Sequence, residues 1–389
     1  VVVPNGDSSG IEPILHAFRN KHPNLNITTI SLPHAGLANA RNEGLRAADR
    51  EFVVFVDDDD TVSDNYLESL FRHAGPNTIS IAQITDIVDG EHHDNPINGQ
   101  IRRAADSYSG DINSIASVLG LNACKLIPAF YTKQLAFNTS LKSGEDVVFY
   151  TNLFTKFSPQ IKILPQNEGA FYFRSMRQNS VSRRPLSFAF NIQERLAVLR
   201  GLEDLHANVF AHAQADFIKD RQVAQAMFIF RYLNNFPEKH SEFLQEAGKS
   251  LKSNQWLIRW INSKLAKRLV ISYCFPPYID PAGIVTAKRI QAAETPVDVI
   301  FNSMKDVRDS DPRLEGIVKD FLGQSIELHT ATSFGNWNAI ECFAEKAMEA
   351  AQTLEASKGH YESLYSRALW PASNFAAALI KVQNPKIHW

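Results

Sequence analysis

The chain has 389 residues, and its 40 Lys and Arg against 42 Asp and Glu give a formal net charge of −2. This length suggests two or three domains with a sizeable core. The balanced charge argues against a nucleic-acid-binding protein, which normally carries a basic excess. The 3 cysteines are too few and too scattered for a disulfide framework or a CxxC metal site. No apolar run approaches the length of a membrane span.

Over the first 186 residues, short apolar runs alternate with segments of helical spacing. We predict strands at 1–3, 27–32 and 52–56, and helices at 11–18, 38–48 and 64–73. The continuous apolar run at 52–56 is typical of a strand that is buried on both faces. Strands that alternate with helices predict a Rossmann-like α/β domain with a mostly parallel sheet.

The pattern changes from residue 187 to residue 267, where Pro and Gly are scarce and apolar residues recur at helical intervals. This predicts a helical linker or insert. A second α/β region then begins, for which we predict strands at 268–273, 297–302, 317–322 and 364–366 and a long helix at 337–354. The predicted domains are therefore 1–186, 187–267 and 268–389. The apolar stretches at both ends of the chain lead us to expect a fragment of a longer polypeptide.

Four carboxylates, Asp57, Asp58, Asp59 and Asp60, directly follow the predicted strand at 52–56. Ligands of open α/β sheets bind at the carboxyl ends of strands. Alternate residues of a strand point the same way, so Asp57 and Asp59 are expected to converge. Clustered carboxylates raise one another's pKa, and a divalent cation with hard oxygen ligands, Mn²⁺ or Mg²⁺, relieves that repulsion.

Two other interpretations of this acidic run stay open at this point. It could be a solvated surface loop. Residues 57–61 also match DxDxT, the first motif of haloacid-dehalogenase-type phosphatases, in which the first Asp is the nucleophile and the second is a general acid.

The surrounding motifs resemble those of family 2 glycosyltransferases, which have the GT-A fold. Residues 36–44 match the family signature G-x-x-x-A-R-N-x-G. The other matching stretches follow in the family's order: the loop at 1–10, residues 122–128 with Phe137, residues 143–149, and residues 172–174 with Ser180 and Ser182. The first strand of the family is absent here, and Pro4 and Asn5 stand where the family has acidic residues.

The resemblance implies a metal-dependent, inverting transfer of a sugar from a nucleoside diphosphate to an acceptor hydroxyl. It implies that Asp146 is the catalytic base, with Glu145 as its neighbour and alternative. The implied nucleotide-sugar contacts are Asn5, Arg41, Asp57, Asp58 and Arg174. The implied ligands of Mn²⁺ or Mg²⁺ are Asp57, Asp59 and Asp60.

The last third of the chain resembles the start of GT-B glycosyltransferases. Residues 269–277, with Gly283 and Arg289 after them, follow that pattern of an apolar strand, "FPP" and a glycine loop. A generic strand-turn-helix unit explains the same residues equally well. We therefore expect a partial Rossmann-like GT-B N-terminal domain and assign no catalytic residues to it.

The resemblance also implies partners and a location. We expect a nucleoside-diphosphate sugar donor, a glycan or lipid-linked acceptor, no nucleic acid, and a cytoplasmic role in surface polysaccharide synthesis. Residues 255–261 could contact the inner face of the membrane as an amphipathic helix, although packing between domains is favoured. A non-catalytic nucleotide-sugar-binding module is the alternative, which Asn5 favours and the intact acidic residues oppose.

Overall fold

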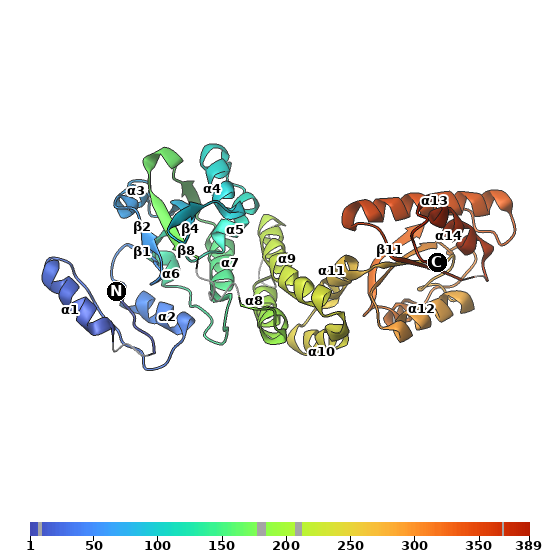
Figure 1. The fold of residues 1–389 in the computed structure, drawn as a ribbon, viewed down its shortest axis with the longest axis horizontal. Coiled ribbons are helices and arrows are strands. Elements are labelled where there is room, and N and C mark those ends of the chain that lie inside the picture. The colour runs from blue at the N-terminus through green and yellow to red at the C-terminus, as the bar shows by residue number, and fades with distance from the viewer. Residues whose placement is uncertain (7–9, 177–183, 207–211, 368) are drawn as a thin grey trace. The chain divides into compact units, whose positions relative to one another are not determined.

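The computed structural model describes residues 1–6, 10–176, 184–206, 212–367 and 369–389. It divides into two compact units, Val1–Gln225 and Ala226–Trp389 (Figure 1). Each unit contains both helices and sheet, which confirms the predicted α/β class. The helical segment predicted at 187–267 is distributed over both units, and the three-domain division stays a prediction.

Two amphipathic helices begin the first unit near their predicted places. They are α1 (Ile11–Lys21) and α2 (Leu37–Ala47), and α2 buries Ala38, Ala40 and Leu45 together with Arg41. The strands predicted at 1–3 and 27–32 are reduced to two isolated parallel bridges, which join Val2 to Thr29 and Asn5 to Leu32.

The first sheet of this unit has the order β1-β6-β3-β7. Its strands are β1 (Phe52–Val54), β6 (Lys125–Pro128), β3 (Thr78–Ile81) and β7 (Gln160–Ile163). Strand β6 is antiparallel to β1 and to β3, and only β3 and β7 are parallel. The expected mostly parallel sheet is therefore wrong here, because β6 inserts between two earlier strands in the reverse direction. Strand-helix alternation along the sequence does not specify such an insertion.

A second sheet has the order β2-β8-β4-β5. Its strands are β2 (Thr61–Val62), β8 (Phe171–Ser175), β4 (Gln83–Val88) and β5 (Glu91–His93). The inner pair β4 and β8 is parallel, and both outer pairs are antiparallel. The helices of this region are α3 (Tyr66–Arg72), α4 (Pro96–Ser107), α5 (Ala116–Leu119), α6 (Ala129–Thr132) and α7 (Glu145–Phe157).

Helices dominate the chain between the two α/β regions. A π-helix, Ala189–Glu194, leads into α8 (Arg195–His206), and α9 (His212–Asn235), α10 (His240–Ser250) and α11 (Gln255–Leu265) follow. Helix α11 buries Leu257, Ile258 and Ile261, so the apolar face of the predicted amphipathic helix packs within the protein. Among the described residues, no helix has the length and apolar character needed to cross a bilayer.

The second unit contains a fully parallel sheet with the order β11-β10-β9-β12. Its strands are β9 (Arg268–Ile271), β10 (Val297–Asn302), β11 (Leu322–Leu328) and β12 (Ser363–Ser366), and its helices are α12 (Pro281–Ala293), α13 (Trp337–Lys358) and α14 (Pro371–Gln383). The strand predicted at 317–322 is wrong. A 3₁₀-helix, Pro312–Ile317, occupies the start of this segment. The amides of Val318 and Lys319 then donate to the Glu315 carbonyl, and strand β11 starts only at Leu322. The resemblance to a GT-B N-terminal domain stays a prediction.

A buried ion pair provides a test of the second unit. The Asp298 carboxylate, fully buried, accepts hydrogen bonds from Lys358 and from the Tyr361 hydroxyl, the latter at 2.5 Å. Asp298→Ala leaves a Lys358 side chain that is only 8% exposed without its counter-charge. We expect denaturant unfolding to show that the free energy of unfolding falls by about 3–5 kcal/mol. As a control, Glu362→Ala removes an exposed pair with Lys267 and should cost less than about 1 kcal/mol. Equal losses in the two variants would contradict this account.

Candidate active site

The acidic residues lie in a turn and not on the end of a strand. Strand β1 ends at Val54, and Val56 is 48% exposed, which corrects the prediction of a buried strand over 52–56. The Asp60 amide donates to the Asp57 carbonyl at 3.1 Å and closes the turn. The alternation of side chains along a strand therefore does not apply to Asp57 and Asp59. Turn geometry places these side chains instead.

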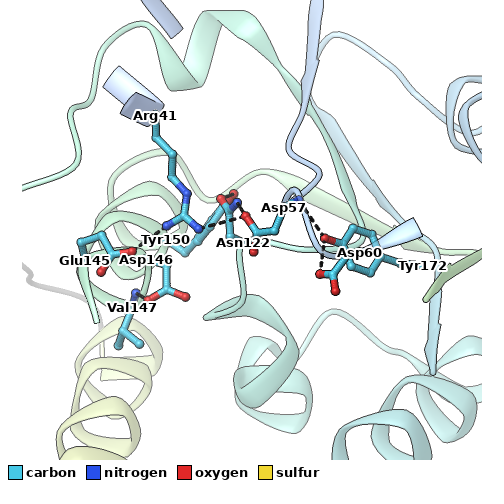
Figure 2. A network of polar contacts seen from close by, with 9 residues as sticks. All are labelled: Arg41, Asp57, Asp60, Asn122, Glu145, Asp146, Val147, Tyr150 and Tyr172. Carbon is cyan, nitrogen blue, oxygen red and sulfur yellow. Dashed lines mark hydrogen bonds and ion pairs between the residues drawn. The ribbon is translucent and has the colours of Figure 1, made fainter. Parts of the chain in front are cut away.

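Strand β8 anchors the end of this acidic turn. The Tyr172 hydroxyl donates to Asp60 Oδ2 at 2.7 Å and accepts from the Asp57 amide at 3.2 Å (Figure 2). The Ser175 amide donates to Asp60 Oδ1 at 2.8 Å. Burial raises the pKa of Asp60, and the hydrogen bonds that Asp60 accepts from Tyr172 and Ser175 oppose that rise. Both oxygens of Asp60 are thus engaged in holding the turn against β8.

Arg41 joins the acidic turn to helix α7. Its Nη2 donates to Asp57 Oδ1 at 3.2 Å, and its Nη1 donates to Glu145 Oε1 at 2.6 Å (Figure 2). The side chains of Arg41 and Glu145 are 8% and 6% exposed, whereas that of Asp57 is 40% exposed. One buried guanidinium therefore neutralises a buried carboxylate on one side and a half-exposed carboxylate on the other.

The neighbours of Arg41 explain why the A-R-N segment has this composition. Burial lowers the pKa of Arg41, but Asp57, Asp146 and Glu145 outweigh it, so that the pKa is raised. The guanidinium also lies 5.5 Å from the Phe137 ring centroid. Asn42 fixes Phe137 through two backbone hydrogen bonds, at 2.9 Å to its carbonyl and 2.8 Å from its amide. Arg41 thus contacts the carboxylates of the site, and Asn42 holds Phe137, whose ring packs against the Arg41 guanidinium.

Asp146 differs from Glu145 although the two are adjacent at the start of α7. Its Oδ1 accepts from the Val147 amide at 2.8 Å, in the first turn of the helix. Burial and the charge of Glu145 raise the pKa of Asp146 to about 6, although Arg41 opposes the rise. A carboxylate with such a pKa is suited to accept a proton near neutral pH. Arg41 binds Glu145, and the role of Asp146 as the base with Glu145 as its neighbour stays a prediction.

The remaining predicted contacts are more dispersed. Asn5 Oδ1 accepts from the Gly36 amide at 2.9 Å, which ties the first loop to the start of α2. Arg174 is paired with Asp86 on the adjacent strand β4, with Nη2 2.7 Å from Oδ1. Asp58 is exposed and Asp59 is half-buried in the acidic turn. Ser180 and Ser182 lie outside the described residues.

Sequence reasoning assigned no site contact to three polar side chains that support the site, Asn122, Tyr150 and Tyr172. Asn122 connects Tyr150 with Asp57. The Tyr150 hydroxyl donates to Asn122 Oδ1 at 3.1 Å, and Asn122 Nδ2 donates to Asp57 Oδ1 at 3.5 Å. Tyr172 lies in the matching stretch 172–174, but no role in holding the acidic turn was predicted for it. Tyr150 lies four residues after Asp146, on the same side of α7, and that spacing was the one available indication.

The acidic turn can supply few metal ligands by itself. Among the described residues, no group of three or more His, Cys, Asp or Glu is placed to hold a metal ion. Within the predicted set, Asp60 accepts from Tyr172 and Ser175, and Asp57 accepts from Arg41. One or two carboxylates are what Mg²⁺ takes when a substrate's phosphates complete its coordination. The residues therefore fit a cation that binds together with a diphosphate.

Comparisons with known proteins agree with the family suggested by these motifs. Residues 1–122 match the model of the glycosyl transferase family 2 domain. The minor teichoic acid biosynthesis protein GgaA of Bacillus subtilis is 24% identical over 189 residues, which cover 46% of this chain and 40% of that protein. The poly(ribitol-phosphate) beta-glucosyltransferase of Bacillus spizizenii is 24% identical over 256 residues, which cover 59% of this chain and 39% of that protein. The chain thus spans about two fifths of the length of these relatives.

Solved structures also resemble the chain, at low similarity. S. aureus TarS 1-349 in complex with UDP-GlcNAc is 17% identical with a TM-score of 0.42, covering 68% of this chain and 75% of that one. The same protein in complex with UDP is 17% identical with a TM-score of 0.37, and the match covers 82% of this chain and 78% of that one. The N-terminal part of this chain carries a glycosyltransferase family 2 domain, as the family model shows.

The central role of Arg41 can be tested by stability. Arg41→Met leaves Glu145 buried without its cation, and we expect a loss of about 3–5 kcal/mol in the free energy of unfolding. Arg46→Ala on the same helix is the matched control, since Arg46 is 69% exposed in its pair with Glu43, and it should leave the free energy of unfolding nearly unchanged. An Arg41→Met variant as stable as Arg46→Ala would show that the buried pair does not hold these elements together.

Proposed function

We propose that this chain transfers a glycosyl group from a nucleoside-diphosphate sugar to a hydroxyl of a surface polymer of the teichoic acid class. The observation that carries the proposal is the Arg41 bridge, which connects Asp57 of the acidic turn to Glu145, the neighbour of Asp146. The family match over residues 1–122 and the names of the two Bacillus relatives support the reaction class and the polymer.

In this proposal, the two ends of the Arg41 bridge serve the two substrates. The donor diphosphate lies at the acidic turn, near Asp57 and Asp59. Asp146 accepts the proton of the acceptor hydroxyl as that oxygen attacks the sugar, and the nucleoside diphosphate leaves from the opposite face. The anomeric configuration is therefore inverted. Glu145, neutralised by Arg41, keeps the start of α7 in place and leaves Asp146 to act as the base.

Asp57 and Asp59 would hold the Mn²⁺ or Mg²⁺ ion. When bound, such a cation stabilises the negative charge that develops on the leaving diphosphate. Asp57 shares its carboxylate with Arg41, so this residue balances two cations in the donor complex. Asp60 supports them indirectly by holding the turn to Tyr172 and Ser175.

The two alternative functions are weaker. The family match includes residues 57–61, which favours a transferase over a dehalogenase-type phosphatase. A decayed binding module would not need to keep Asp146 beside Glu145 with a pKa near 6, a feature that serves proton transfer. The cytoplasmic location, with association at the inner face of the membrane, belongs to this proposal as the place where sugar nucleotides and lipid-linked acceptors meet.

A nucleotide-sugar panel tests the reaction directly. The complete protein is incubated with single donors and acceptor polymer, and release of nucleoside diphosphate is measured with and without Mn²⁺. We expect metal-dependent release from one donor, and a loss of at least about 100-fold in Asp59→Ala. Asp49→Ala, an exposed carboxylate that precedes β1, should retain full activity. Release of phosphate from phosphomonoesters, with no donor turnover, would favour the phosphatase instead.

The raised pKa of Asp146 predicts the pH dependence of transfer. A base must be deprotonated, so the rate should rise about tenfold per pH unit up to pH near 6 and level off above it. Asp146→Asn should lower kcat by roughly 10²–10⁴ and remove this acid limb. An acid limb that persists in Asp146→Asn would assign the titration to another group.

A further inference from the structure

We propose that Arg195, the first residue of α8, is a positioning residue that holds Asp146 in its catalytic place through the loop Ser143–Gly144. This inference rests on the proposed function of Asp146. Arg195 lies well beyond the residues 1–122 that match the family model, so that match assigns it no role.

A buried polar cluster connects Arg195 to the loop before α7. Arg195 Nη2 donates to Ser143 Oγ, and Ser143 Oγ donates to the Glu194 carboxylate. Arg195 Nη1 also donates to Gln225 Oε1 at 3.1 Å. The side chains of Arg195 and Glu194 are 5% and 11% exposed, and Ser143 is 6% exposed. Because these groups are buried, each depends on the others for its hydrogen bonds.

The π-helix Ala189–Glu194 helps to place this cluster. It contributes Glu194 and also Phe190, whose ring lies 4.7 Å below the Arg195 guanidinium. π-helical turns are rare and are frequently found at functional sites. Here it ends at the residue before Arg195, so that Glu194 and Arg195 reach the same serine from consecutive positions.

Gly144 transmits the position of this cluster to the base. It has the left-handed backbone angle φ +74° and is the cap residue of α7. A Cβ atom at Gly144 would lie 2.8 Å from Val198 Cγ2 and 3.6 Å from Arg195 Nη1. One turn further along, a Cβ at Gly201 would lie 3.2 Å from Val148 Cγ2. The Gly144 loop and α8 are therefore packed in close contact, and the loop has no room to move toward α8. We call this contact, together with the Arg195–Ser143 hydrogen bond, the clamp.

The clamp matters because Asp146 is only two residues from Gly144. If Ser143 loses its partners, the left-handed turn can relax, and the first turn of α7 then moves with it. A displacement of about 1 Å in a catalytic group can cost about 100-fold in rate. Asp60 and β8 also hold the acidic turn, in addition to its link to Glu145 through Arg41, so we expect the donor contacts to change less than the position of Asp146.

The test compares Arg195→Ala, Arg195→Lys and Ser143→Ala in the complete protein. We expect Arg195→Ala to lower kcat for transfer about 100-fold, while KM for the donor and the Kd for the free nucleoside diphosphate change less than about threefold. Arg195→Lys should recover part of the rate because it restores a donor to Ser143. Ser143→Ala, a small change in volume, should lower kcat in the same direction without unfolding the protein.

Arg221→Ala is the matched control. Arg221 is also a buried arginine of the helical segment, with a side chain 9% exposed, but its ion pair is with Asp220 and not with the Ser143 loop. It should lower Tm without a specific loss of kcat. The proposal is overturned if Arg195→Ala keeps full kcat, or if kcat, nucleotide affinity and Tm fall together as they do in a generally destabilised protein.

A second measurement separates this proposal from the function on which it rests. If the wild-type protein turns over no donor, the proposed function fails, and amide hydrogen exchange then decides the positioning claim. Faster exchange confined to residues 143–148 in Arg195→Ala supports the clamp. Unchanged exchange at these residues contradicts it.

Discussion

The first unit depends on one buried cation, Arg41, which is shared by two carboxylates from separate parts of the chain. A buried guanidinium is tolerated only when opposite charges and hydrogen bonds compensate for its lost hydration. Helix α2, the acidic turn and the start of α7 must therefore keep a fixed arrangement, because each supplies one member of the Asp57–Arg41–Glu145 bridge. The signature around Arg41 thus has a structural cause as well as a chemical use.

This constraint also explains how two neighbouring carboxylates acquire different properties. Arg41 pairs directly with Glu145, whereas burial and the charge of Glu145 raise the pKa of Asp146 to about 6, although Arg41 opposes that rise. Their different surroundings, and not their residue types, therefore give the two carboxyl groups different properties. The clamp from α8 would add a third level of support, since it fixes the loop on which both carboxylates depend.

The sequence predicted the α/β class and strands such as β9, β10 and β12, but it did not predict β2 to β8 or the pairing of the strands. Strand β10 was predicted to the residue, because its six consecutive residues are all buried and four of them are apolar. The antiparallel insertion of β6 and the turn at Asp57–Asp60 escaped prediction, because strand direction and turn closure depend on partners distant in sequence. Arg41 and Glu145 are 104 residues apart, so only a family motif placed them at one site. Arg174 was assigned to the nucleotide, and no local pattern indicated its partner Asp86 on the adjacent strand.

The central claim is that the acidic turn binds the donor and that α7 presents the base to the acceptor. The most direct measurement is a crystal structure of the complete protein with Mn²⁺ and a non-hydrolysable nucleoside-diphosphate sugar. The account predicts the cation on Asp57 and Asp59, the diphosphate beside it, and the Asp146 carboxylate facing the anomeric carbon from the side opposite the diphosphate. A nucleotide bound away from the acidic turn, or an anomeric carbon that Asp146 cannot approach from that side, would contradict it.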